Sequence, residues 1–153
     1  MSSAAHDWDD RYAASELVWS TGPNVFVERF AEGLRPGRVL DVCYLHLPAR
    51  RRRLALQSAA RAVAPGGALL VVAHHTDNLT GGVGGPQDAA VLYSESDVRE
   101  DLDGTGLDVQ RAERVSRVVV TEAGERLAWD ALVAAARPWR PTRCGSGGIV
   151  EDR

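Results

Sequence analysis

GRVLDVCYLHLP, residues 37–48, is the stretch that decides how the fold of this chain is interpreted. A turn residue and an arginine lead into residues 39–42, VLDV, an apolar segment typical of a buried parallel strand. In nucleotide-binding α/β units, glycines that open a helix follow such a strand. Here residues 43–46, CYLH, follow instead, and Pro48 suits the first position of a new helix. The segment therefore joins a nucleotide-type first strand to a helix without a phosphate-type loop.

Length, charge and composition exclude several classes of protein. At 153 residues, one domain that buries about 70% of its unfolded surface is expected. The net charge of −3 gives no electrostatic footprint for nucleic acid or anionic membranes. No apolar run approaches the ~20 residues that span a bilayer. Residues 1–10, MSSAAHDWDD, lack the basic region and apolar core of a signal peptide. We therefore expect a cytoplasmic protein without nucleic-acid or membrane partners.

Hydrophobic periodicity and turn residues predict the elements along the chain. Helices are expected over residues 7–16, 24–32, 48–64 and 94–102, and strands over residues 38–45, 68–74, 107–121 and 125–137. Residues 76–93 are expected to form a long loop, and residues 138–153 lack periodicity and are predicted to be disordered. The pattern predicts an α/β fold with a partly parallel sheet of about four strands and a C-terminal antiparallel hairpin.

Four segments carry a resemblance to one enzyme family. They are WDDRYAASELVWSTGPN (8–24), GLRPGRVLDV (33–42), YLHLPARRRRLALQSAARAVAPGGALLVVAHH (44–75) and TDNLTGGVGGPQDAAVLY (76–93). Together they resemble class I S-adenosylmethionine-dependent methyltransferases. The N-terminal W-x-x-R-Y with a later Trp is similar to the tellurite-resistance and thiopurine methyltransferase branch. The resemblance implies a truncated, Rossmann-like methyltransferase domain over residues 1–137, followed by the tail 138–153.

The resemblance also implies that an internal segment is missing after Val42. In the family, the strand matching residues 38–42 is the first, and YLHLP lies at the end of the fourth. Each intervening βαβ unit takes about 30 residues or more, so roughly 60 or more residues are absent. The family sheet has the order 3-2-1-4-5-7-6. If the fused strand 38–45 takes the place of the fourth strand, the remainder is a contiguous half-sheet, 4-5-7-6.

S-adenosylmethionine as cofactor and a small-molecule methyl acceptor are the ligands that the resemblance implies. Asp41 is retained from the cofactor site, and Trp8, Tyr12 and Trp19 resemble aromatic residues that fold over cofactor and substrate. An ordinary core role is the alternative for these aromatics. The missing segment carries the glycine-rich loop and the ribose-binding acid, which weighs against ordinary cofactor binding. The first function to consider is a methyltransferase acting on a small molecule, and the alternative is a non-catalytic remnant or a homodimerising interaction module.

Three histidines mark the expected pocket. His46, His74 and His75 come at or just after the carboxyl ends of neighbouring strands, where α/β sheets bind ligands. Tyr93 is expected to contribute to substrate recognition. Imidazole titrates near neutrality and suits a general base, although methyl transfer can proceed by positioning alone. A metal site that includes Asp77 would instead indicate a metal-dependent hydrolase. We expect pocket-lining histidines and no metal.

Three further features have structural consequences. Gly81–Gly85 lacks the Gly-Lys-Ser/Thr ending of a phosphate loop and is predicted to form a flexible lid over the strand ends. Arg50–Arg53 opposes the dipole in the first turn of its helix, and a solvated helix end is expected there, with an anion contact as the alternative. The missing segment would leave residues 39–42 at a sheet edge, and such edges pair with other chains. We therefore expect a homodimer through strand 38–45, or an aggregation-prone monomer.

Overall fold

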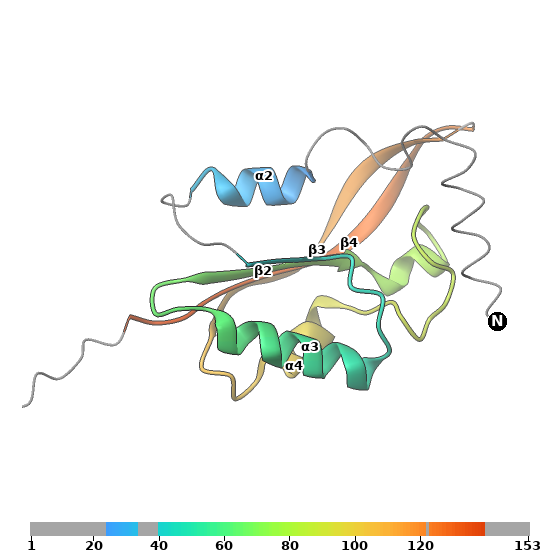
Figure 1. Cartoon of the computed structure of the whole chain (residues 1–153). Helices are drawn as coiled ribbons and strands as arrows, with labels where there is room; N and C mark the ends of the chain where they lie inside the picture. The colour runs from blue at the N-terminus through green and yellow to red at the C-terminus, as the bar shows by residue number, and fades with distance from the viewer. Residues whose placement is uncertain (1–23, 34–39, 122, 140–153) are drawn as a thin grey trace, which may run out of the picture. The chain divides into compact units, whose positions relative to one another are not determined.

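The structure is a computed structural model that describes residues 24–33, 40–121 and 123–139 (Figure 1). The chain divides into two compact units, Met1–Pro36 and Gly37–Arg153, and each is described by itself. The predicted helix 7–16, Trp8, Tyr12, Trp19 and nearly all of the tail 138–153 lie outside the described residues. The extent of the methyltransferase-like domain therefore stays a prediction.

In the first unit the structure describes one helix, α2 (Val25–Ala31). Asn24 caps its amino end, because the side-chain oxygen accepts the backbone N–H groups of Phe26 at 2.9 Å and of Val27 at 3.4 Å. The helix predicted over residues 24–32 is confirmed.

The second unit contains a four-stranded sheet with the order β1-β2-β4-β3. Its elements are β1 (Leu40–Cys43), α3 (Ala49–Ala62), β2 (Ala68–His74), the 3-10 helix η1 (Thr76–Leu79), α4 (Glu95–Leu102), β3 (Asp108–Thr121) and β4 (Gly124–Ala136). None of the described helices has the length and apolar character that crossing a bilayer requires.

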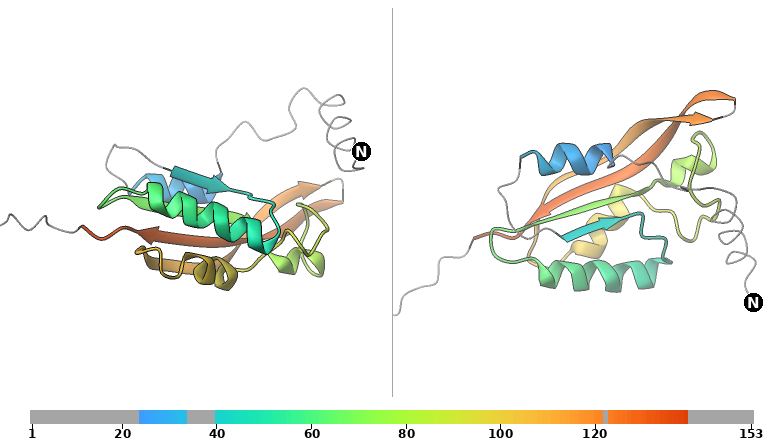
Figure 2. Two further views of the ribbon diagram at one scale, coloured as in Figure 1. Left: turned by 60° about the horizontal axis from the view of Figure 1, so that its bottom comes forward. Right: turned by 45° about the horizontal axis from the view of Figure 1, so that its top comes forward.

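The strand order agrees with the expected half-sheet, but fewer strands are parallel than in the sheet of the family. β1-β2-β4-β3 is the order of the expected half-sheet, 4-5-7-6. However, only β1 and β2 are parallel, whereas β4 runs antiparallel to both of its neighbours. The sheet is thus predominantly antiparallel, because a tight turn at Gly124, with φ of 100°, returns β4 between β2 and β3. The hairpin of β3 and β4 continues past the end of β2 (Figure 2).

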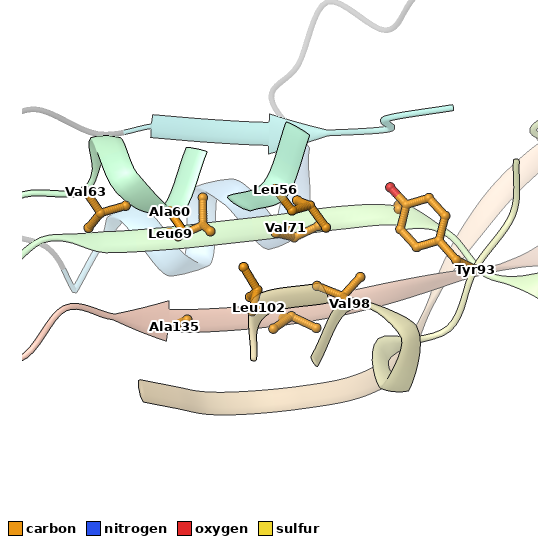
Figure 3. Packing of buried hydrophobic residues seen from close by; sticks show 11 residues of the cluster. Leu56, Ala60, Val63, Leu69, Val71, Tyr93, Val98, Leu102 and Ala135 are labelled. Atoms are coloured by element: carbon orange, nitrogen blue, oxygen red, sulfur yellow. The ribbon is translucent and has the colours of Figure 1, made fainter. Parts of the chain in front are cut away.

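Helices α3 and α4 pack on one face of this sheet (Figures 1 and 2). Their apolar positions meet the inward side chains of β2 and β4 in one buried cluster (Figure 3), which includes Leu56, Ala60, Val63, Leu69, Val71, Ala73, Tyr93, Val98, Leu102, Val133 and Ala135. The i, i+4 spacing of Leu56 and Ala60 places both on the buried stripe of α3. The cluster holds the strand ends in place for the site described below.

The arginine run at the start of α3 differs from the expected solvated helix end. Arg52 is buried, and its Nε donates to Asp101 Oδ2 of α4 at 2.6 Å. Its guanidinium lies 4.6 Å from the centre of the Tyr93 ring. The expectation of a solvated side chain is wrong for Arg52, because it stands one turn before Leu56 on the same helix face.

Candidate functional site

Five side chains from three strands and one loop meet near the carboxyl ends of β1 and β2. The parallel pairing of these strands brings Tyr44 and His46 beside His74. Tyr44 has a left-handed backbone with φ of 49°, and its N–H donates to the carbonyl of Val72 at 2.7 Å. The Tyr44 and His74 ring centres lie 4.4 Å apart, and the His46 and His74 rings stack at 5.4 Å. In the sheet register His74 is opposite Asp130, so the residues form one site, termed the Asp130 cluster: Tyr44, His46, His74, Arg117 and Asp130.

Asp130 is the centre of this cluster and is fully buried. Its Oδ2 accepts a hydrogen bond from Arg117 Nε at 2.8 Å and from the Tyr44 hydroxyl at 3.4 Å. Its Oδ1 lies 3.3 Å from Nδ1 of His74. A buried carboxylate is costly unless paired, so the guanidinium of Arg117 compensates the charge while His74 stands at the second oxygen.

Sequence reasoning found His46 and His74 but missed Tyr44, Arg117 and Asp130. The available signal was a single acid in the apolar run LAWDALVAAA, residues 127–136. A lone ionisable residue in a buried strand requires a partner. Which residue is the partner follows only from strand pairing, since β3 and β4 bring Arg117 and Asp130 together diagonally.

Burial sets the protonation state at the site. The pKa of His46 lies below its ordinary value of 6.5, first because burial disfavours the charged ring and second because His74 is close. Burial by itself lowers the pKa of Arg117, but the Asp130 carboxylate and then Tyr44 outweigh this effect and raise the pKa above its ordinary value, so this side chain stays charged. At neutral pH the cluster therefore contains a neutral imidazole beside a compensated ion pair.

Three buried polar atoms of this cluster, His46 Nε2, His74 Nδ1 and Asp130 Oδ1, have no hydrogen-bond partner among the described residues. The rings of His46 and His74 are 12° from parallel, and ring N–H groups lie in the ring plane. Direct proton transfer between stacked rings is thus geometrically excluded. His46 can accept a proton only from a third group, such as a small polar ligand.

The glycine segment lies directly against this cluster. Gly85 has φ of +73°, and a Cβ atom there would come within 2.6 Å of the His74 ring. The N–H of Val83 donates to the Leu127 carbonyl at 3.0 Å, which attaches the segment to β4. Close packing therefore explains this glycine, in agreement with a cover over the strand ends rather than a phosphate loop.

His75 and Tyr93 lie elsewhere and have structural contacts. His75 Nδ1 accepts the N–H of Asp77 at 3.0 Å, and its Nε2 lies 3.3 Å from the Glu95 carboxylate. These contacts cap η1 and link it to α4. The hydroxyl of Tyr93, a core residue, donates to the Leu45 carbonyl at 3.0 Å. The structure thus brings only His46 and His74 of the four predicted pocket residues together.

The proposed metal ligands do not converge in the described part of the chain. No set of three His, Cys, Asp or Glu side chains there is arranged to hold a metal ion. Asp77, the acid of the hypothetical site, forms an ion pair with Arg114, which stacks at 4.3 Å on Trp129.

The residues after β1 do not fit S-adenosylmethionine in the manner of the family. Asp41 stands in β1, paired with Leu70. However, the sequence has no glycine between Gly37 and Gly66, so side chains occupy every position where a family loop would bring bare backbone to the cofactor. Pro48 is the N-cap of α3 and provides no side-chain cap hydrogen bond.

Comparison with known proteins gives little further information. The sequence matches no protein-family profile and no curated protein. Alba from Thermoplasma volcanium aligns at a TM-score of 0.41 and 10% identity, over 64% of this chain and 100% of that chain. A SAM-dependent methyltransferase from Methanosarcina mazei aligns at a TM-score of 0.39 and 12% identity, over 59% of this chain and 53% of that chain. This chain therefore spans about half the length of that methyltransferase. Likenesses at this level assign no activity.

Proposed function

We propose that the chain is a member of the S-adenosylmethionine-dependent methyltransferase family that keeps the acceptor side of the fold and binds a small polar molecule at the Asp130 cluster. One observation carries the proposal: a half-buried, neutral His46, whose buried Nε2 has no hydrogen-bond partner among the described residues, lies at the carboxyl ends of two parallel strands. This edge is where α/β sheets bind ligands. The strand order that the resemblance implies supports the ancestry.

Each residue of the cluster has a role in this proposal. His46 accepts a proton from a hydroxyl or thiol of the ligand, because its low pKa keeps the imidazole neutral. The rings of Tyr44, His46 and His74 already contact one another, and an aromatic ligand would extend this group of rings. Asp130 accepts hydrogen bonds from Arg117 and Tyr44, and its second carboxylate oxygen lies beside His74. The ligand class is therefore a small aromatic molecule with an acidic X–H group.

A pair of aromatic probes tests the binding site. Phenol and toluene have similar rings, but only phenol has an X–H group for His46. NMR titration should show shifts of the His46 and His74 ring resonances with phenol and smaller shifts with toluene. In the variant His46→Phe the preference for phenol should disappear. Equal responses to both probes, or none, would contradict the proposed role of His46.

S-adenosylmethionine binding decides whether the chain is an active methyltransferase. Calorimetry with S-adenosylmethionine and S-adenosylhomocysteine measures this directly. Micromolar binding would support methyl transfer with a cofactor site different from the family's glycine loop, and thiol acceptors would then be screened. No heat at millimolar ligand would exclude this cofactor and leave the second candidate, a non-catalytic interaction module.

A further inference from the structure

The free edge of β1 is a candidate interaction surface. β1 lies at one end of the sheet order, and among the described residues only β2 pairs with it. An edge strand presents unpaired N–H and C=O groups that can hydrogen-bond to another strand. We infer that β1 pairs in an antiparallel manner with β1 of a second copy of this chain. This interface goes beyond the proposed function and does not depend on it.

The backbone register identifies which groups face outward. The backbone N–H of Tyr44 donates to the carbonyl of Val72 in β2, so the backbone groups of Tyr44 face β2. Successive residues of a strand direct their backbone groups to opposite sides, which places Leu40 and Val42 toward β2. The N–H and C=O groups of Asp41 and Cys43 then face the free edge.

These outward groups are complementary to a second copy of themselves. An antiparallel pairing about a two-fold axis at Val42 sets Asp41 of each copy opposite Cys43 of the other. Both are outward residues, so each such pair exchanges two N–H···O bonds. The contact is isologous and closes after two copies, since the same edge is used on both sides. It would join the two four-stranded sheets into one continuous sheet.

The opposite edge of the sheet is less suited to pairing. β3 has a register irregularity between Val109 and Arg111 and four ionisable residues within residues 111–117. Bulges and charges on an edge strand prevent pairing with other chains. By contrast, β1 has one acidic residue, Asp41, and no basic residue among its four. The inference therefore selects β1 over β3.

Proline substitutions distinguish hydrogen bonds at the outer edge of β1 from hydrogen bonds between β1 and β2. Cys43→Pro removes an outward N–H and leaves the ladder to β2 intact, whereas Val42→Pro removes a bond to β2. Sedimentation equilibrium of the full chain should show a dimer. Cys43→Pro removes one N–H from each copy and should weaken association roughly 30-fold with the circular dichroism spectrum unchanged. Val42→Pro should instead lower the thermal stability of the monomer.

Amide exchange gives a second readout that needs no substitution. At high concentration the amides of Asp41 and Cys43 should be protected, and dilution to monomer should release them while Val42 stays protected. A wild-type monomer at all concentrations would overturn the inference. Protection of Asp41 and Cys43 that persists on dilution would also overturn it, since the edge would then be covered within one chain.

Discussion

Replacing Arg52 with methionine should be among the most destabilising substitutions in this protein. The side chains of Arg52 and Asp101 are each only 7% exposed, and Arg52 Nε lies 2.6 Å from Asp101 Oδ2. Methionine keeps most of the aliphatic length but leaves the Asp101 carboxylate buried without its cation. Breaking such a buried pair costs about 3–5 kcal/mol of unfolding free energy. Loss of the guanidinium over Tyr93 adds to this by about 1 kcal/mol.

A double substitution distinguishes the cost of an orphaned charge from the value of the pair. Arg52→Met with Asp101→Leu removes both charges, and apolar replacements of buried pairs are often neutral or stabilising. We therefore expect the double variant to lie within about 1 kcal/mol of wild type or above it. Arg111→Met is the matched control, because Arg111 pairs with Glu113 on the exposed face of β3 and should lose less than about 1 kcal/mol.

Urea unfolding, followed by circular dichroism at one protein concentration, measures Arg52→Met, Asp101→Leu, the double variant and Arg111→Met. The reasoning fails if Arg52→Met resembles the surface control. It also fails if the double variant loses as much stability as the two single variants together, because additive losses would mean that Arg52 and Asp101 do not interact.

Three more outcomes follow from the site and its surroundings. Gly84 and Gly85 both have positive φ, but only at Gly85 would an added Cβ meet the ring of His74. Gly85→Ala should therefore destabilise the protein by at least about 1 kcal/mol more than Gly84→Ala and shift the His74 resonances. Equal losses of stability would refute the contact. NMR titration should give His46 a pKa below 6.5. Because folding lowers this pKa, the contribution of His46 to the unfolding free energy should be fully present above pH 6.5 and should decrease as the pH falls below that value. The variant His46→Gln should lose this dependence, and an unchanged pH profile would contradict the assignment. Ser94→Ala removes the capping box of α4 and should cost about 0.5–2 kcal/mol in thermal unfolding, whereas no loss would show that the cap is dispensable.

Local chemistry made much of the fold predictable. Ser94 with acids behind it predicted the start of α4, and the structure shows the complete capping box. The apolar run 68–74 predicted β2, whose central residues are buried. The strand order required the family resemblance as well, because composition and periodicity do not specify which strands are neighbours.

The candidate site was predictable only in part. His46 and His74 follow strand ends directly, so parallel pairing of two strands sufficed to bring them together. His75 is the next residue after His74 but belongs to the cap of η1, and neighbouring positions in a chain need not share an environment. Tyr93 enters the core because its aromatic body is apolar and its hydroxyl finds the Leu45 carbonyl.

The sequence by itself determined the approximate positions of the described α-helices and strands and which residues could titrate near neutrality, but it did not predict η1 within the expected loop 76–93. Only the tertiary structure decided that Asp130 and Arg117 complete the site with His74 and that Arg52 is buried. The physical reason is that periodicity and capping act over a few residues, whereas charge compensation in a core requires partners that sheet and helix packing bring together from distant parts of the chain.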